Sequence, residues 1–195
     1  MPVKKRRMRP LSGLIRREGH QETKKVQMLR YSDIQVVFRE VPGEISLAID
    51  ITGCPLRCEG CHSPWLREDT GHPLTEETLL AVADANPGIS CVALLGGDAD
   101  PAEVARLLCT IKRERPALKT CWYSGRSLDE ARRHVGPEAV DYLKVGPYVA
   151  SAGPLDIPTT NQRMYRVVKE SFADGITVRY DDITPLFREH PAETI

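Results

Sequence analysis

From Met28 onward, short apolar runs alternate with longer amphipathic segments. The runs are typical of strands, and Ile89–Leu95 is so uniformly apolar that both of its faces are expected to be covered, as in a parallel sheet. The predicted strands of this part are Glu44–Ile51, Ile89–Leu95, Lys119–Tyr123 and Val140–Val145. Two further runs, Met164–Phe172 and Ile176–Tyr180, flank Asp174-Gly175 and predict a C-terminal hairpin.

Helix-start signals lie between these strands. Thr75 is an expected N-cap with two glutamates behind it, and its helix should run to about Asn86. Asp100-Pro101 supplies an N-cap and a first-turn proline for a second helix that ends before Pro116. The third predicted helix is Ser127–His134. Strands that alternate with helices indicate an α/β protein with a parallel sheet and right-handed crossovers.

In such folds the functional residues gather where the parallel strands end. The four strands are followed in order by Thr52-Gly53-Cys54, Gly96-Gly97-Asp98, Ser124-Gly125 and Gly146-Pro147. Glycine lets the backbone bend or approach a ligand closely, so we expect these segments to form one ligand-binding rim.

Composition changes the picture mainly at the N-terminus. Residues 1–27 carry nine basic side chains against two acidic ones, a net of +7, which leaves −7 on residues 28–195. The segment lacks a periodic apolar face and the apolar stretch of a secretory signal, so we interpret it as a disordered leader or the product of an upstream start codon. A nucleic-acid-binding arm and a transit peptide are the functional alternatives. Residues 28–195 form the second predicted unit, and their acidic balance argues against nucleic-acid binding.

Three cysteines within eight residues carry the strongest chemical signal. They are Cys54, Cys58 and Cys61, followed directly by His62. Four interpretations compete: a c-type haem attachment site, a Cys58–Cys61 redox pair, a zinc site that adds His62, and a [4Fe–4S] cluster. Haem attachment needs export, a redox pair leaves Cys54 without a role, and structural zinc ligands usually come as two separated pairs. Three thiolates on a four-iron cluster leave one iron open to a small molecule.

The C-x3-C-x2-C spacing after the first strand of a β/α unit resembles the radical S-adenosylmethionine (SAM) superfamily. Gly96-Gly97-Asp98 resembles the GGE-type motif of that superfamily, which packs against the methionine ammonium group of SAM. The resemblance implies an incomplete parallel β/α barrel with a C-terminal hairpin. It also implies a cluster on Cys54, Cys58 and Cys61, with SAM contacts from the six residues Gly60, Cys61, His62, Gly96, Gly97 and Asp98.

Further motifs look like those of the activating components of anaerobic ribonucleoside-triphosphate reductases. They are Thr52–Trp65, Leu95–Asp98, Cys121–Gly125, Leu143–Tyr148 and Thr160–Arg163. The resemblance covers about Met28 to Phe187. It departs from many superfamily members at Gly60, where an aromatic residue often stands, and at His62, where many activators have tyrosine. We expect the backbone at Gly60 to contact adenine, and the imidazole of His62 to stack or hydrogen-bond.

The resemblance implies a glycyl-radical-activating oxidoreductase whose protein substrate is the large reductase subunit. It needs an external low-potential electron donor, and family members form homodimers or complexes with the reductase. An enzyme acting on a small molecule, similar to 7-carboxy-7-deazaguanine synthase, and a zinc-stabilised interaction domain are the alternatives. Without an 18-residue apolar run or an export signal, we expect a cytoplasmic protein with no membrane association.

The remaining candidates favour structural roles. Cys91, Cys109 and Cys121 are widely spaced, and we expect them to be small buried hydrophobic residues, so no second cluster is predicted. Trp65, Trp122 and Tyr148 are expected in the core or at an interface. Four polar residues near the rim either bind a carboxylate or ribose or form solvated surface: Lys144, Asn161, Gln162 and Arg163.

Overall fold

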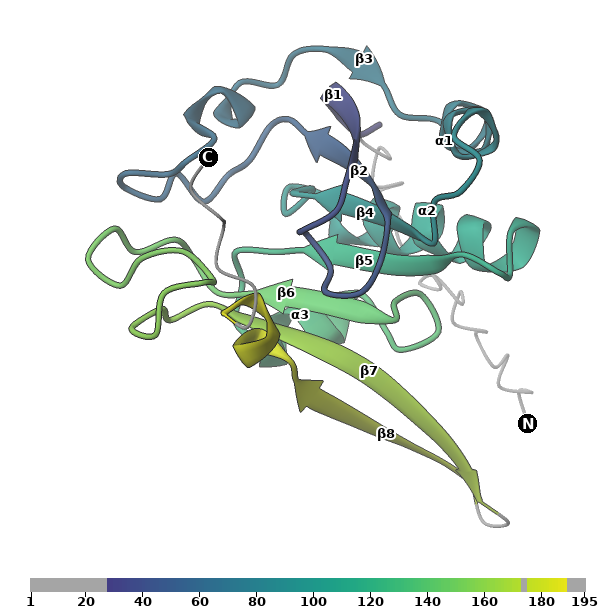
Figure 1. Ribbon diagram of the computed structural model, residues 1–195. Coiled ribbons are helices and arrows are strands. Elements are labelled where there is room, and N and C mark those ends of the chain that lie inside the picture. Colours follow the sequence, from purple (N-terminus) through teal and green to yellow (C-terminus); the bar gives the residue numbers. More distant parts are fainter. Residues whose placement is uncertain (1–27, 173–174, 189–195) are drawn as a thin grey trace, which may run out of the picture.

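The computed structural model describes residues 28–172 and 175–188, in which eight strands form one open sheet in the order β3-β1-β2-β4-β5-β6-β7-β8 (Figure 1). The segment 1–27 lies outside these residues. The strands are β1 (Arg30–Val37), β2 (Ser46–Ile51), β3 (His72–Pro73), β4 (Cys91–Leu95), β5 (Lys119–Tyr123), β6 (Tyr142–Val145), β7 (Arg163–Phe172) and β8 (Gly175–Asp182). The helices are α1 (Glu76–Ala85), α2 (Pro101–Glu114), α3 (Leu128–His134) and the 3-10 turns η1 (Pro64–Arg67) and η2 (Thr184–Phe187).

The four strands β2, β4, β5 and β6 are parallel, which confirms the α/β prediction for the centre of the sheet. One helix lies in each connection between them. The C-terminal hairpin is also confirmed, since β7 and β8 pair antiparallel and project beyond the rest of the sheet. The strand pairing shows no barrel closure, because β3 and β8 remain at opposite edges. The sheet curvature of an incomplete barrel therefore stays a prediction.

The three helices begin where the capping residues predict. The side-chain oxygens of Thr75 and Asp100 accept hydrogen bonds from backbone N–H groups three residues ahead, at 3.1 and 3.2 Å. Ser127 forms a reciprocal capping box with Glu130. These caps satisfy N–H groups that have no partner inside the helix, so the helix starts are set locally by the sequence.

Strand β1 has no counterpart in the sequence predictions. It pairs antiparallel with β2, and most of its side chains are exposed. Its connection to β2 folds over the sheet face that the helices leave free. There Val41 is fully buried, the hydroxyl of Tyr123 donates to the carbonyl of Glu40, and the hydroxyl of Tyr142 donates to Glu44 Oε1 at 2.7 Å.

The sheet thus separates two cores. The larger one lies between the sheet and the helices and contains Ile49, Leu94, Trp122 and Leu143. The smaller one lies on the other face, where Val41 and Ile183 pack against Cys91, Cys121 and further residues. No helix among the described residues is both long and apolar enough to span a membrane.

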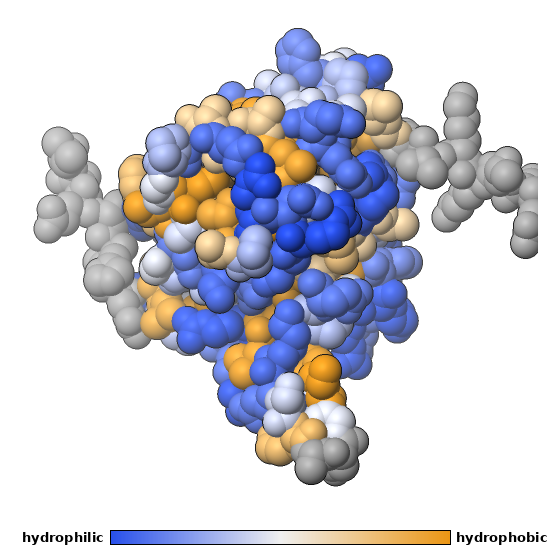
Figure 2. All heavy atoms as spheres, turned by 90° about the vertical axis from the view of Figure 1, so that its right-hand side faces the viewer, coloured by the Kyte–Doolittle hydropathy of each residue, from blue (hydrophilic) through white to orange (hydrophobic). Residues whose placement is uncertain are grey.

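Apolar side chains are exposed at the far end of the hairpin. Phe172 and Ile176 are 56% and 70% exposed there. Figure 2 views the molecule from the right-hand side of Figure 1 and shows the hairpin as a projection with apolar atoms near its end. This end of β7 and β8 lies away from the parallel strands of the sheet (Figure 1).

Candidate functional site

A cavity of about 520 Å³ lies at the C-terminal ends of the parallel strands. Each of the four predicted rim segments contributes to its lining, which confirms that they form one rim. The contributing residues are Cys54 after β2, Gly96 and Asp98 after β4, Ser124 and Gly125 after β5, and Gly146 after β6. The volume falls within the usual range for small-molecule sites.

The three clustered cysteines occupy a loop, residues 54–61, that we call the thiol loop. Its path requires left-handed backbone at Gly53, Arg57 and Gly60, with φ of 76°, 48° and 68°. The loop is fastened at its start by a hydrogen bond from Cys54 N to Leu66 O (2.9 Å) and in its middle by Arg67 Nη2 to Cys58 O (2.5 Å). The loop is thus bent so that Cys54, Cys58 and Cys61 reach the cavity.

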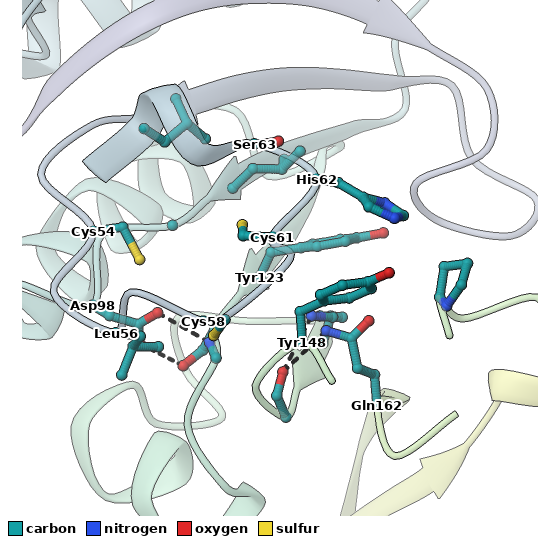
Figure 3. Close-up of a pocket in the computed structure, with 18 of the residues that line it drawn as sticks. Cys54, Leu56, Cys58, Cys61, His62, Ser63, Asp98, Tyr123, Tyr148 and Gln162 are labelled. Atoms are coloured by element: carbon teal, nitrogen blue, oxygen red, sulfur yellow. Dashed lines mark hydrogen bonds between the residues drawn. The ribbon is translucent and has the colours of Figure 1, made fainter. Parts of the chain in front are cut away.

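Cys54, Cys58 and Cys61 all line the cavity, and all three are free thiols. In the view of Figure 3 their sulfur atoms surround one part of the cavity, with Asp98 and Leu56 on one side and the rings of Tyr123 and Tyr148 on the other. Among the described residues, no three His, Cys, Asp or Glu side chains converge on a point that would hold a single metal ion. The arrangement therefore does not present a preformed mononuclear zinc site.

Asp98 joins the ends of β4 and β5. Its carboxylate is buried and accepts hydrogen bonds from Ser124 Oγ (2.6 Å) and Gly125 N (3.0 Å), with Arg126 Nε at 3.3 Å. The carbonyl of Asp98 accepts a further hydrogen bond from Arg126 Nη2 at 2.8 Å. Each carboxylate oxygen is thus already engaged by the protein, so Asp98 fixes the shape of the rim while one of its faces stays open to the cavity.

Gly96 and Gly97 face different directions. Gly96 lines the cavity, and its carbonyl accepts a hydrogen bond from the indole of Trp122 at 2.7 Å. A Cβ at Gly97 would lie 2.5 Å from Val104 Cγ2 of α2, inside the core. A side chain at position 97 would therefore enter the helix-covered core. The left-handed turn (φ 88°) gives the position this direction, and the expected backbone contact of Gly97 with SAM stays a prediction.

The thiol loop meets a second loop, residues 146–162, across the cavity mouth. The ring centroids of His62 and Tyr148 are 4.6 Å apart at an interplanar angle of 48°. A Cβ at Gly60 would lie 3.1 Å from Cβ of Ala150, so only glycine allows this approach without displacement. Gly60 is exposed and does not line the cavity, whereas His62 and Tyr148 do. The His62 imidazole thus makes a tilted ring contact within the protein, and its expected contact with SAM stays a prediction.

The cavity floor is one row of the sheet register. Asp50, Leu95, Tyr123 and Lys144 are successive neighbours across β2, β4, β5 and β6, and all four line the cavity. Burial lowers the pKa of Lys144 to about 8, against the opposing effect of Asp98 and the thiols of Cys58 and Cys61. Burial also raises the pKa of Asp50, helped by neighbouring acidic groups. The floor therefore has an acidic end and a basic end.

Burial also shifts the pKa of one of the three cavity thiols. It raises the pKa of Cys54, while backbone N–H groups of the loop oppose the shift and Asp98 adds to it. A bare Cys54 thiol is therefore held protonated at neutral pH. A metal that takes its thiolate must displace that proton, so binding is coupled to proton release.

A family model described as a 4Fe-4S single cluster domain matches residues 42–164, well over half of the chain. The match begins before β2 and includes the thiol loop and the ends of all four parallel strands. The chain belongs to this 4Fe-4S single cluster domain family. Comparison with curated proteins and with solved structures gives no significant match.

Membership of the single-cluster family makes this an iron–sulfur protein. Its cysteines fit one cluster: three line the cavity together, and the other three lie elsewhere. Cys91 and Cys121 are buried in the sheet, as predicted, and Cys109 of α2 is half-buried against the core. A four-iron cluster is larger than a single ion and takes thiolates that stand further apart. Cys54, Cys58 and Cys61 would therefore hold it.

Of the other residues predicted near the rim, some line the cavity and others hydrogen-bond to the backbone of the loop. Lys144 and Gln162 line the cavity, whereas Asn161 donates to the carbonyl of Pro147 and Arg163 to that of Thr160. Trp122 is a core residue, as expected, and Trp65 is 58% exposed. Sequence reasoning missed several lining residues, namely Asp50, Arg57, Arg67 and Tyr123. The alternation within each strand, read from the rim backward, would have found Asp50 and Tyr123.

Proposed function

We propose that this iron–sulfur protein is a radical SAM enzyme that activates a glycyl radical on an anaerobic ribonucleoside-triphosphate reductase. The observation that carries the proposal is the placement of three free thiols, spaced C-x3-C-x2-C, around one cavity at the ends of four parallel strands. A cluster on Cys54, Cys58 and Cys61 leaves one iron for a substrate to bind. When bound, the cluster supplies the electron that cleaves SAM into methionine and a 5′-deoxyadenosyl radical.

The residues of the chain bind and orient SAM in this proposal. Lys144 reaches the cavity, no carboxylate of the described residues is in hydrogen-bond contact with it, and its ammonium group suits the methionine carboxylate. The side chain of Gln162 is buried, donates to the carbonyl of Gly146 and lines the cavity with its remaining polar surface. Tyr123 and Leu95 form an apolar stretch of floor between the two charged ends. Such a site can bind the charged groups of a zwitterionic nucleoside at the two ends of the floor and its rings on the apolar stretch.

The loop packing at the mouth covers one side of the cavity. His62 and Tyr148 close one side of the cavity by ring contact, and Gly60 lets the thiol loop lie against Ala150. An organic radical is quenched by any nearby hydrogen donor, so a covered site is a chemical requirement. The proposed substrate is a glycine Cα–H of the reductase, and an external low-potential donor supplies the electron. A cytoplasmic location is part of the same proposal.

A second candidate, an enzyme that modifies a small molecule, is favoured by the cavity volume. About 520 Å³ is within the range of sites that bury small ligands. The two candidates share the cluster and SAM and differ only in the molecule that loses hydrogen. Discrimination therefore depends on the product.

The test is anaerobic reconstitution followed by assays of iron, SAM cleavage and radical formation. The proposal expects about four irons per chain, SAM cleavage that needs reductant, and a glycyl doublet in the paramagnetic resonance spectrum once reductase is added. The doublet should vanish with Cys61→Ala and persist with Cys109→Ala. Turnover of a small molecule with no protein radical would establish the second candidate, and stoichiometric zinc without sulfide would refute both.

A further inference from the structure

A second cavity, of about 350 Å³, opens on the same face of the sheet as the cluster cavity. It lies between the β1–β2 connection, β7 and η2. Its lining consists of Phe38, Arg39, Pro42, Gly43, Arg166, Leu186 and Phe187. Arg39 and Phe187 line the cluster cavity as well, so the two cavities adjoin.

The charge of this second cavity is one-sided. Two of its lining residues are arginines, and none of its described lining residues is acidic. The guanidinium of Arg166 is exposed and has no ion-pair or hydrogen-bond partner within the described part of the chain. The neighbouring carboxylates are engaged elsewhere: Asp181, its partner in register, accepts from Arg179 Nε at 2.6 Å, and Glu44 accepts from Tyr142.

The apolar residues of the cavity point to a protein occupant. Phe38 is 70% exposed at its edge, and Phe187 forms the boundary with the cluster cavity. Aromatic residues and arginine are the types enriched where proteins bind one another, because they combine large contact area with directed polar groups. The exposed ring of Phe38 and the exposed guanidinium of Arg166 therefore suit a segment with an apolar and an acidic side chain.

We propose that the second cavity binds an acidic peptide segment of the protein substrate, next to the residue presented to the cluster cavity. The inference rests on the proposed function, since it assumes a protein substrate. A carboxylate of that segment pairs with Arg166, and an adjoining apolar side chain packs against Phe38. The shared lining at Arg39 and Phe187 lets the same segment continue into the cluster cavity.

Charge reversal at Arg166 tests the proposal in the reconstituted enzyme. Arg166→Glu should raise the KM for reductase about tenfold, the loss of one charge-assisted hydrogen bond. Iron content and reductase-independent SAM cleavage should stay unchanged, because Arg166 does not line the cluster cavity. The matched control is Arg133→Glu, an equal charge change on exposed α3 across the sheet. An unchanged KM with normal radical yield would overturn this inference and leave the proposed function standing.

A peptide assay decides the same point without the reductase. Two fluorescent dodecapeptides share a central glycine, one flanked by aspartates and phenylalanine and the other by asparagines and phenylalanine. The acidic peptide should bind the wild-type enzyme more tightly, and Arg166→Glu, but not Arg133→Glu, should remove that preference. Equal binding of both peptides would overturn the inference. Acidic-peptide binding with no radical on the reductase would refute the proposed substrate instead.

Discussion

The loops that follow β2 and β4 border the same cavity but are held in different ways. The thiol loop is fastened by backbone bonds and one arginine, and its three cysteines are free thiols that line the cavity. The corner Gly96–Asp98 is satisfied by the protein itself, through Trp122, Ser124 and Gly125. The polar groups of the corner are paired within the protein, whereas the thiols of the thiol loop are available to a ligand. Substitutions in the two loops should therefore affect different quantities.

The largest expected effect is on iron. Cys58→Ala removes one of three thiolates from the thiol loop, so reconstituted protein should fall from about four irons per chain to near zero. Folding should change little, because Cys58 is only partly buried and lies in a loop. Cys91→Ala, in the sheet, is the control: it should keep iron and lose about 1 kcal/mol of stability. Iron retained by Cys58→Ala would mean that the thiol loop does not bind the iron.

Asp98→Ala should have the opposite profile. It leaves Ser124 and Gly125 without the acceptor that they share and Arg126 without its ion-pair partner, so the free energy of unfolding should fall by about 2–3 kcal/mol. Urea unfolding of the cluster-free protein measures the change. Asp129→Ala removes only an exposed pair with Arg132 and should cost about 0.5 kcal/mol or less. Equal effects at the two positions would show that the corner is not self-supporting.

Gly97→Ala separates backbone strain from steric conflict. Gly97 and Gly88 both have left-handed backbone, with φ of 88° and 97°, but only at Gly97 does an added Cβ meet core atoms. Gly88→Ala should show the cost of strain alone. Gly97→Ala should cost about 1–2 kcal/mol more, from overpacking against Val104. Iron bound per folded chain should stay the same, and a selective loss of SAM binding would show that the position does face the cavity.

The smallest expected effect is the contribution of Lys144 to the pH dependence of folding stability. Its folded pKa of about 8 lies below its ordinary value of 10.5, so the unfolded chain binds more protons between these pH values. Stability of the cluster-free protein should therefore rise by about 1 kcal/mol as pH increases from 8 to 9. The difference between wild type and Lys144→Met isolates this rise from the titration of cysteines.

Local signals in the chain were enough to predict the centre of the fold. Caps at Thr75, Asp100 and Ser127 and the apolar run of β4 are encoded by adjacent residues. Strand β1 was missed because it is held by pairing with β2, and its mostly exposed side chains show no apolar period. Pairing between distant segments of that kind produces little recognisable pattern in the sequence.

The candidate site was predictable to a similar extent. The spacing of the cysteines and the glycines after each strand indicated the rim, and the structure places them at one cavity. The direction of Gly97 could not be predicted, because it depends on where α2 packs. The covering of the free sheet face by Val41 and Glu40 likewise depends on a long connection that folds back, and so the second cavity had no sequence signal.

The row that forms the cavity floor makes the protein sensitive to insertions and deletions. Asp50, Leu95, Tyr123 and Lys144 stand level only because four strands share one register. Neighbouring strands are about 4.8 Å apart, so the row holds its acidic and basic ends roughly 14 Å from each other. A single residue inserted into β5 would turn Tyr123 toward the helices and bring the indole of Trp122 into the cavity. During divergence, side chains of this row can be exchanged one at a time, whereas changes in length must be confined to the loops.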